Sequence, residues 1–175
     1  MSTKLFITLI LVAFGTTGWA QTESIRSAEV QFDSAYAVRI TMEEIDGVYI
    51  PENLGDAFAE IKRLTSPADM EKFRQLPEDV AREKLHFSLG RWMIHNWGFY
   101  EGSRMSHYLR ERGLEHPDDM ARVLLVSLHR HLNGVPLEVD TQIAGYRALR
   151  DAERAQREAR KEVISEEKRV RKKNQ

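Results

Sequence analysis

The sequence from Pro77 to Ser103 reads PEDVAREKLHFSLGRWMIHNWGFYEGS and holds two of the three tryptophans and two of the six histidines of the 175-residue chain. Pro77 suits the first turn of a helix, where a missing N–H costs nothing, and the acidic Glu78 and Asp79 favour the positive end of the helix dipole. Gly98 is typical of a helix end, because glycine accepts the left-handed backbone conformation at no steric cost. These signals predict a helix that begins at Pro77 and ends near Gly98.

Apolar side chains recur along this stretch at steps of three and four residues, the spacing that places side chains on one helical face. One row consists of Val80, Ala81, Leu85, Leu89, Trp92 and Asn96, and a second row beside it consists of His86, Gly90, Met93 and Trp97. Because the apolar arc is wide, we expect other elements to cover this helix on more than one side. It is therefore interpreted as the central helix of a small bundle.

Four further helices are predicted around the central one. Their expected ranges are Asn53 to Thr65, Ser66 to Leu76, Ser103 to Gly113 and His116 to Asn133. Asn53, Ser66 and Ser103 are side chains that cap helix N-termini, and Gly113 and Gly134 are typical of helix ends. The connecting loops are short, which favours neighbouring helices that run antiparallel.

Hydrophobic residues alternate with polar residues ahead of the bundle. Val30, Phe32, Tyr36, Val38, Ile40 and Met42 all fall on even positions. Period-two alternation predicts a strand with one covered face, and Asp46-Gly47 is a turn signal ahead of Val48. We therefore expect extended chain here and a hairpin packed on the helices, or else a loosely attached linker.

Residues 141–173 contain no proline and only one glycine, Gly145, and predict one long helix. Small apolar residues form a seam along it: Ala144, Ala148, Ala152, Ala155, Ala159 and Val163. The pairs Glu153–Arg157 and Glu167–Arg171 have favourable i,i+4 spacing, worth about 0.2–0.5 kcal/mol each. The helix is interpreted as solvated, or else as a docking arm whose seam forms a weak coiled coil with a partner or a second copy and whose basic end suits an acidic envelope surface.

The predicted fold class is all-α: a small five-helix bundle, preceded by a short extended or β segment and followed by a long charged C-terminal helix. The chain is divided into a signal peptide at residues 1–20, a polar and extended segment at 21–44, a helical core domain at 45–137 and a charged helical tail at 138–175. The length suits one domain with tails.

The first twenty residues have the pattern of a secretory signal peptide. Lys4 is basic, Leu5 to Phe14 is an apolar run interrupted only by Thr8, and Gly18-Trp19-Ala20 supplies the small residues of a cleavage site. A membrane-spanning helix needs about 20 apolar residues, so the length of this run favours a cleaved signal over the alternative, an uncleaved membrane anchor. We expect cleavage after Ala20, no membrane span in the mature protein, and a periplasmic or secreted location.

Composition narrows the class of function. The chain has no cysteine, which excludes disulfides, thiolate metal sites, cysteine nucleophiles and lipid attachment at a cysteine. Without Lys4, 25 basic and 27 acidic residues remain, and 11 of the basic but only 6 of the acidic residues lie in residues 147–175. Residues 21–146 therefore carry a net charge of −7 and the tail +5, which argues against a core that binds nucleic acid.

The histidines do not form a metal-binding motif. His129 and His131 are two residues apart and His86 and His95 nine apart, so neither pair has the i,i+4 spacing of helical ligands, and HExxH is absent. A metal site would have to be assembled from different helices: His86 or His95 with His116, Asp118 or Glu101. No metal and no cofactor is assigned.

His116-Pro117-Asp118-Asp119 places two carboxylates beside an imidazole, the groups used in general acid–base catalysis. The same residues also suit a helix N-terminus, where each acid contributes about 0.3–1 kcal/mol, and this structural interpretation is favoured. GxSxG and glycine-rich phosphate loops are absent. No catalytic residue is assigned.

Aromatic and polar side chains gather at the end of the central helix, and this is the candidate interaction surface. It comprises Trp97, Tyr100, Glu101 and Arg104, together with His116, Asp118 and Asp119 of the next helix start. Aromatic anchors with polar neighbours are typical of recognition surfaces. The alternative interpretation places the aromatic residues in the core.

A set of motifs resembles a small bacterial helical family that is described only as a domain of unknown function. The motifs are Ile50-Pro51, His86, Gly90, Asn96-Trp97-Gly98, Ser103, Gly113 and His116-Pro117-Asp118-Asp119-Met120. The resemblance spans about residues 45–137. The family pattern has a serine after Asp-Asp-Met where this chain has Ala121, which argues against a role for a hydroxyl there. The resemblance implies an all-helical fold and no established activity.

These observations favour an exported protein of the bacterial envelope that binds another protein or envelope component and is not an enzyme. A specific form is an immunity-type or inhibitor protein. One alternative is a metal-dependent hydrolase that uses His86, His95, His116, Asp118 and Glu101. Another is a structural envelope protein that dimerises through residues 141–173.

Overall fold

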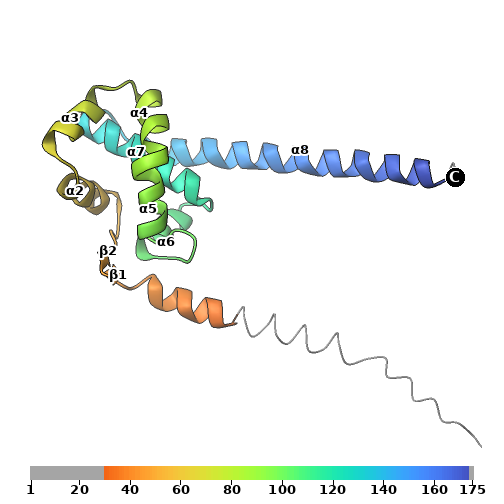
Figure 1. The fold of residues 1–175 in the computed structure, drawn as a ribbon, viewed down its shortest axis with the longest axis horizontal. Coiled ribbons are helices and arrows are strands. Elements are labelled where there is room, and N and C mark those ends of the chain that lie inside the picture. Colours follow the sequence, from red (N-terminus) through yellow and green to blue (C-terminus); the bar gives the residue numbers. More distant parts are fainter. Residues whose placement is uncertain (1–29, 174–175) are drawn as a thin grey trace, which may run out of the picture. The chain divides into compact units, whose positions relative to one another are not determined.

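The computed structural model describes residues 30–173 (Figure 1). The signal peptide expected at residues 1–20 and the polar stretch that follows it lie outside the described residues. The described residues divide into two units, residues 30–37 and residues 38–173. The second unit contains the helical bundle.

Residues 30–39 are helical, so the strand predicted from the alternating pattern is wrong for this segment. Phe32 and Tyr36 are four residues apart, and their rings stack with centroids 6.4 Å apart. Steps of four also fall on even positions, so the row Phe32, Tyr36 and Ile40 is one face of a helix as well as part of a period-two pattern.

The predicted hairpin is present as two short strands, β1 (Glu44–Ile45) and β2 (Val48–Tyr49), which pair antiparallel with Ile45 opposite Val48. Asp46 and Gly47 both have positive φ, at 52° and 77°, as a two-residue type I′ turn requires. Ile45 is buried in the main core. The hairpin is thus attached to the bundle, and the linker interpretation is wrong here.

The next two helices begin at the predicted caps. α2 (Leu54–Leu64) is capped by Asn53, whose Oδ1 accepts a hydrogen bond from the amide of Asp56 at 3.0 Å. α3 (Pro67–Gln75) is capped by Ser66, and Pro67 occupies its first turn. Both caps satisfy amides that have no partner within the helix.

The central helix is present but is interrupted. α4 (Glu78–Leu85) continues into a π-helical turn, η1 (His86–Gly90), and then into α5 (Arg91–Asn96). All three segments pack against α7. A Cβ on Gly90 would lie 3.3 Å from Nδ1 of His86, a tight contact, so glycine allows this close approach of the helix backbone and the imidazole. Gly98, with φ of 59°, ends the segment as predicted.

The core forms around α7 (Pro117–Leu132), which follows α6 (Arg104–Arg110). Ser103 and Ser106 form a capping box at the start of α6. Ten residues of α7 are buried, from Asp119 to His129, and its contacts include α2, α3, α4, α5 and α6. The all-α class is confirmed, and β1–β2 is the only sheet among residues 30–173.

The last helix, α8 (Val139–Lys173), belongs partly to the core. Ile143 is 3% exposed and lies in the main core cluster, against which Tyr146 also packs. The core therefore continues past the boundary expected at residue 137. Every described side chain from Arg154 onward is exposed. Within residues 30–173, no helix is both long and apolar enough to cross a membrane.

The alanine seam of α8 does not make its contact with the bundle. Ala144, Ala148 and Ala152 are all exposed, whereas Ile143 and Tyr146 on another face are covered. Of the predicted ion pairs, Glu153 pairs with Arg150 at 3.0 Å instead of Arg157. The docking role of the seam stays a prediction.

Candidate functional site

A buried carboxylate lies at the start of α7. Asp119 is 1% exposed, and its two oxygens accept hydrogen bonds from Nε and Nη2 of Arg150, both at 2.7 Å. Nη1 of Arg122 donates to the same carboxylate at 3.2 Å. A buried charge needs such partners, because its desolvation otherwise costs several kcal/mol. Asp119 thus ties the start of α7 to α8.

His86 and Asp118 form a second pair beside it. Nε2 of His86 lies 3.1 Å from Oδ1 of Asp118, a hydrogen bond that requires the proton on Nε2. His86 is 3% exposed, and its Nδ1 has no hydrogen-bond partner among the described residues. The π turn positions this imidazole, and such turns are frequent at functional sites.

The surroundings keep His86 neutral. Burial lowers the pKa of the His86 imidazole below its ordinary value, and the nearby Arg122 guanidinium lowers it further, while Asp118 acts in the opposite sense. Burial also raises the pKa of the Tyr146 phenol. A neutral imidazole and a neutral phenol therefore lie around the Asp119–Arg150 pair.

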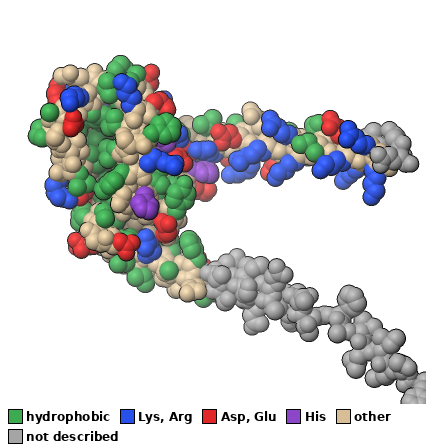
Figure 2. Space-filling model, viewed as in Figure 1, with side chains coloured by type: hydrophobic (Ala, Val, Ile, Leu, Met, Phe, Trp, Pro, Cys, Tyr) green, Lys and Arg blue, Asp and Glu red, His purple; other side chains and the backbone are tan. Residues whose placement is uncertain are grey.

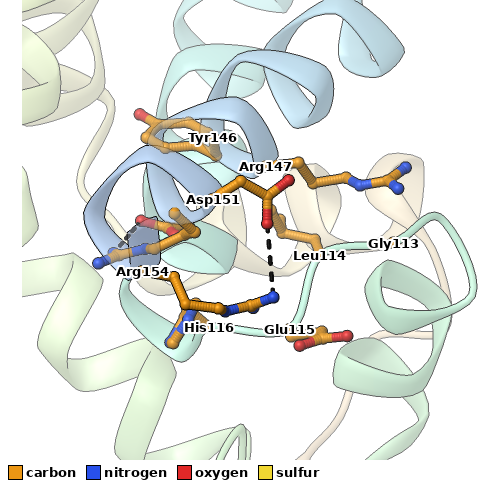
Figure 3. A pocket seen from close by; sticks show the side chains of 10 residues that line it. Gly113, Leu114, Glu115, His116, Tyr146, Arg147, Asp151 and Arg154 are labelled. Carbon is orange, nitrogen blue, oxygen red and sulfur yellow. Dashed lines mark hydrogen bonds and ion pairs between the residues drawn. The ribbon is translucent and has the colours of Figure 1, made fainter. Parts of the chain in front are cut away.

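A small cavity of about 230 Å³ opens next to Asp119 (Figure 3). Its lining includes three arginines, Arg147, Arg150 and Arg154, and three carboxylates, Glu115, Asp119 and Asp151. Asp151 lies 3.6 Å from Arg154, and a dashed line in Figure 3 marks this pair. The numbers of arginines and carboxylates are equal, so their charges do not favour an anion or a cation. Of the ion pairs at the cavity, Asp119–Arg150 links α7 to α8, and Asp151–Arg154 lies within α8.

The predicted interaction surface is divided by the fold. Trp97 is 0% exposed and belongs to the core, so its assignment to a surface is wrong. Tyr100 and Glu101 are exposed in the turn after α5. Arg104 lies with its guanidinium 5.0 Å above the Tyr49 ring and donates to the carbonyl of Ile50, which fixes the hairpin to α6.

The second part of the predicted surface serves the fold. Asp119 is buried, and Asp118 is held by His86. His116 is exposed at the start of α7 and lines the small cavity. The residues predicted to form one surface therefore make separate contacts, most of which stabilise the bundle.

The side chains proposed for a metal-dependent enzyme are not assembled. Only His86 and Asp118 pair with each other. His95 and Glu101 are exposed, and no hydrogen bond or ion pair links either of them to that pair in the described part of the chain. Between residues 30 and 173, no three His, Asp or Glu side chains lie close enough together to hold a metal ion. The geometry gives no support to the hydrolase interpretation.

An apolar groove of about 540 Å³ runs between α3 and the α4–η1 segment, and we call it the α3–α4 groove. Its apolar lining is Met70, Phe73, Leu76, Leu85, Leu89 and Leu128, and its polar lining is Thr65, Asp69, Lys72, Lys84 and Ser88. Phe73 and Leu128 are buried, whereas Met70, Leu76, Leu85 and Leu89 are only half-buried. Apolar side chains thus form most of the lining of the groove.

Two leucines of the groove wall are predicted from the sequence to lie in the core. Leu85 and Leu89 belong to the wide apolar arc of the central helix, which was expected to be covered on more than one side. The short helix α3, nine residues long, leaves that side partly open. Periodicity shows which face is apolar, but it does not show how much of that face a neighbouring helix covers.

Comparison with protein families finds a match within the bundle. Residues 50–132 match the family model described as a domain of unknown function, DUF6794. The match covers 83 of the 175 residues of the chain. It begins at Ile50, after the hairpin, and ends at Leu132, the last residue of α7. The resemblance predicted for residues 45–137 is thus confirmed.

The residues matched by the DUF6794 model include His86, Asp118 and the whole α3–α4 groove, whereas Arg150 and the rest of α8 lie outside them. No curated protein and no solved structure matches the chain.

Proposed function

We propose that this is an exported envelope protein that acts by binding a partner protein in its α3–α4 groove. The observation that supports the proposal is the groove itself. Four of its apolar side chains are half-buried in the free protein and would lose their remaining contact with water under a partner. Each 100 Å² of apolar surface covered in this way contributes about 2.5 kcal/mol before the costs of association.

The shape of the groove suits an apolar segment of a partner. A volume of about 540 Å³ accommodates a few large side chains, and Leu85 and Leu89 lie one helical turn apart along its wall. An amphipathic helix places anchors at steps of three, four and seven residues into such grooves. The partner is therefore expected to present two or three large apolar residues on one helical face.

The charges at the rim define the partner further. Lys72 is paired with Asp69 at 2.9 Å. Lys84 is exposed, and no ion pair of the described residues involves it. A carboxylate next to the apolar anchors would complement Lys84 and favour one orientation of the bound segment. In one form of this proposal, the protein is an inhibitor whose groove binds a helix of an envelope toxin or hydrolase.

The proposal is tested by selecting ligands for the mature protein from a displayed library of helical peptides. The selected peptides are expected to share apolar anchors at helical spacing and an Asp or Glu beside them. Leu89→Gln should then weaken the binding of a selected peptide at least about tenfold, because a central anchor contact is lost. Fluorescence anisotropy with a labelled peptide measures this change.

The matched control is Phe87→Gln, also in η1. Phe87 is 77% exposed and does not line the groove, so its replacement should leave peptide affinity within about twofold of wild type. Peptides without shared anchors, or equal losses in the Leu89 and Phe87 variants, would overturn the proposal. Circular dichroism confirms that both variants are folded.

A further inference from the structure

Basic side chains follow one face of α8 in a regular order. From Arg147 to Arg171, every position at alternating steps of three and four residues is Arg or Lys, with Ile164 as the one exception. This spacing keeps the side chains on one face, and the row drifts by only about 20° per seven residues around a straight helix. Its distal part is Arg154, Arg157, Lys161, Lys168 and Arg171, which we call the basic row.

The proximal and distal positions of this face differ in their partners. Arg150 neutralises the buried Asp119, and Arg154 lies 3.6 Å from Asp151. Beyond them, no ion pair among the described residues involves Lys161, Lys168 or Arg171, and all three are exposed. The distal charges therefore do not stabilise the bundle.

Acidic and small residues lie on the other sides of the same helix. At 100° per residue, Glu162 and Glu166 are about 100–160° from Lys161 and Lys168, and Ala155 and Ala159 lie on that side as well. Glu158 and Glu167 flank the row, each about 40° from one of its arginines. Figure 2 shows Lys and Arg side chains following one another along α8. Cations therefore predominate along this face, with two carboxylates at its edges.

We propose that the basic row binds the anionic surface of a phospholipid bilayer. A straight helix presents the row as a line about 26 Å long between Arg154 and Arg171, and such a line can touch a flat surface along its whole length. The export signal predicted at residues 1–20 favours an envelope surface over a nucleic acid as the partner of this row. Anionic headgroups attract each Lys or Arg that reaches the surface.

The row makes an electrostatic contact and does not insert into the bilayer. Ile164 is its one apolar member, and helices that insert into a bilayer carry large apolar residues along one whole face. Binding should therefore be reversed by salt, which screens exposed charges beyond about 10 Å at 0.1 M. This contact uses α8, outside the residues that match the DUF6794 model, and is independent of the groove.

The test compares two double variants of the mature protein by co-sedimentation with vesicles. Lys161→Gln with Lys168→Gln removes two charges from the row. Arg160→Gln with Arg169→Gln removes two charges one residue away, which lie about 100° around the helix. Both variants have the same net charge, so the comparison isolates the position of the lost charges.

The wild-type protein is expected to bind vesicles that contain phosphatidylcholine and phosphatidylglycerol, and salt should release it from them. It is expected not to bind vesicles of phosphatidylcholine alone. The Lys161/Lys168 variant should bind about ten- to thirtyfold more weakly, and the Arg160/Arg169 variant within about threefold of wild type. Equal losses in the two variants, or binding to the neutral vesicles, would overturn the proposal. So would tighter, row-dependent binding to duplex DNA or RNA. Circular dichroism verifies that α8 stays helical.

Discussion

Asp119 carries a negative charge at a position almost closed to water, and two arginines from different helices compensate it. Nothing in the spacing of the sequence connects Asp119 with Arg150, 31 residues away. The same arrangement explains why His116-Pro117-Asp118-Asp119 is a structural motif of the bundle. Its first acid holds the imidazole of His86, and its second acid holds α8.

Arg150→Met should destabilise the protein by about 3 kcal/mol, because it leaves the Asp119 charge buried with Arg122 as its remaining partner. Urea denaturation measures the change in the free energy of unfolding. Arg154→Met is the matched control, since its ion pair with Asp151 is exposed and worth at most about 1 kcal/mol. Similar small losses in both variants would contradict the role assigned to Arg150.

His86 makes stability depend on pH. Its pKa is lower in the folded than in the unfolded protein, so below the ordinary histidine pKa of about 6.5 the unfolded chain binds more protons. Stability contributed by the neutral imidazole should therefore be fully present above that pH and should fall on acidification. His86→Gln should flatten the dependence of the free energy of unfolding on pH between about 5 and 6.5. His95→Gln, at an exposed position, should retain the wild-type slope.

Helix starts and ends were the elements best predicted from the sequence. The predicted N-caps accept hydrogen bonds from backbone amides of the first turn: Asn53, Ser66 and Ser103. The predicted helix ends Gly98 and Gly113 have positive φ. Both kinds of signal could be predicted because they act within one helical turn. The segment at residues 30–39 was predicted wrongly, since its apolar spacing fits two periods. The extent of α3 over the central helix, which decides the groove, depends on tertiary packing and has no local signal.

Two truncations should distinguish the contributions that the two parts of α8 make to stability. A chain that ends after Pro136 loses Ile143, Tyr146 and Arg150, and should lose at least about 3 kcal/mol of stability or fail to unfold cooperatively. A chain that ends after Glu153 keeps these contacts and should stay within about 1 kcal/mol of wild type. Thermal and urea unfolding measure both. Equal stability of the two truncated chains would show that α8 is dispensable for the core.

The two proposed contacts use different parts of the molecule. The α3–α4 groove lies within the residues that match the DUF6794 model, and the basic row lies outside them. The net charge of −7 on residues 21–146 and of +5 on residues 147–175 follows the same division. A protein built in this way can recognise a partner with one part while another part holds an anionic surface.

The groove and the row should therefore act additively. Leu89→Gln should leave vesicle binding unchanged, and Lys161→Gln with Lys168→Gln should leave peptide affinity unchanged, each within about 0.5 kcal/mol. A variant that carries all three substitutions should lose peptide affinity and vesicle binding, each by the same factor as in the separate variants. Measuring peptide anisotropy in the presence and absence of vesicles checks this expectation, and a vesicle-induced change in peptide affinity would contradict it.

The π turn at His86–Gly90 shows how one additional residue in a helical turn can determine the direction of a side chain. A π turn holds one more residue than an α turn, and Phe87, the most exposed large apolar residue of this turn, contributes little buried surface there. Deleting Phe87 would restore a regular helix and rotate α4 by about 100° relative to α5. His86 would then point away from Asp118, although no residue of the pair had been changed. In this protein the additional residue of the π turn sets the position of the buried imidazole.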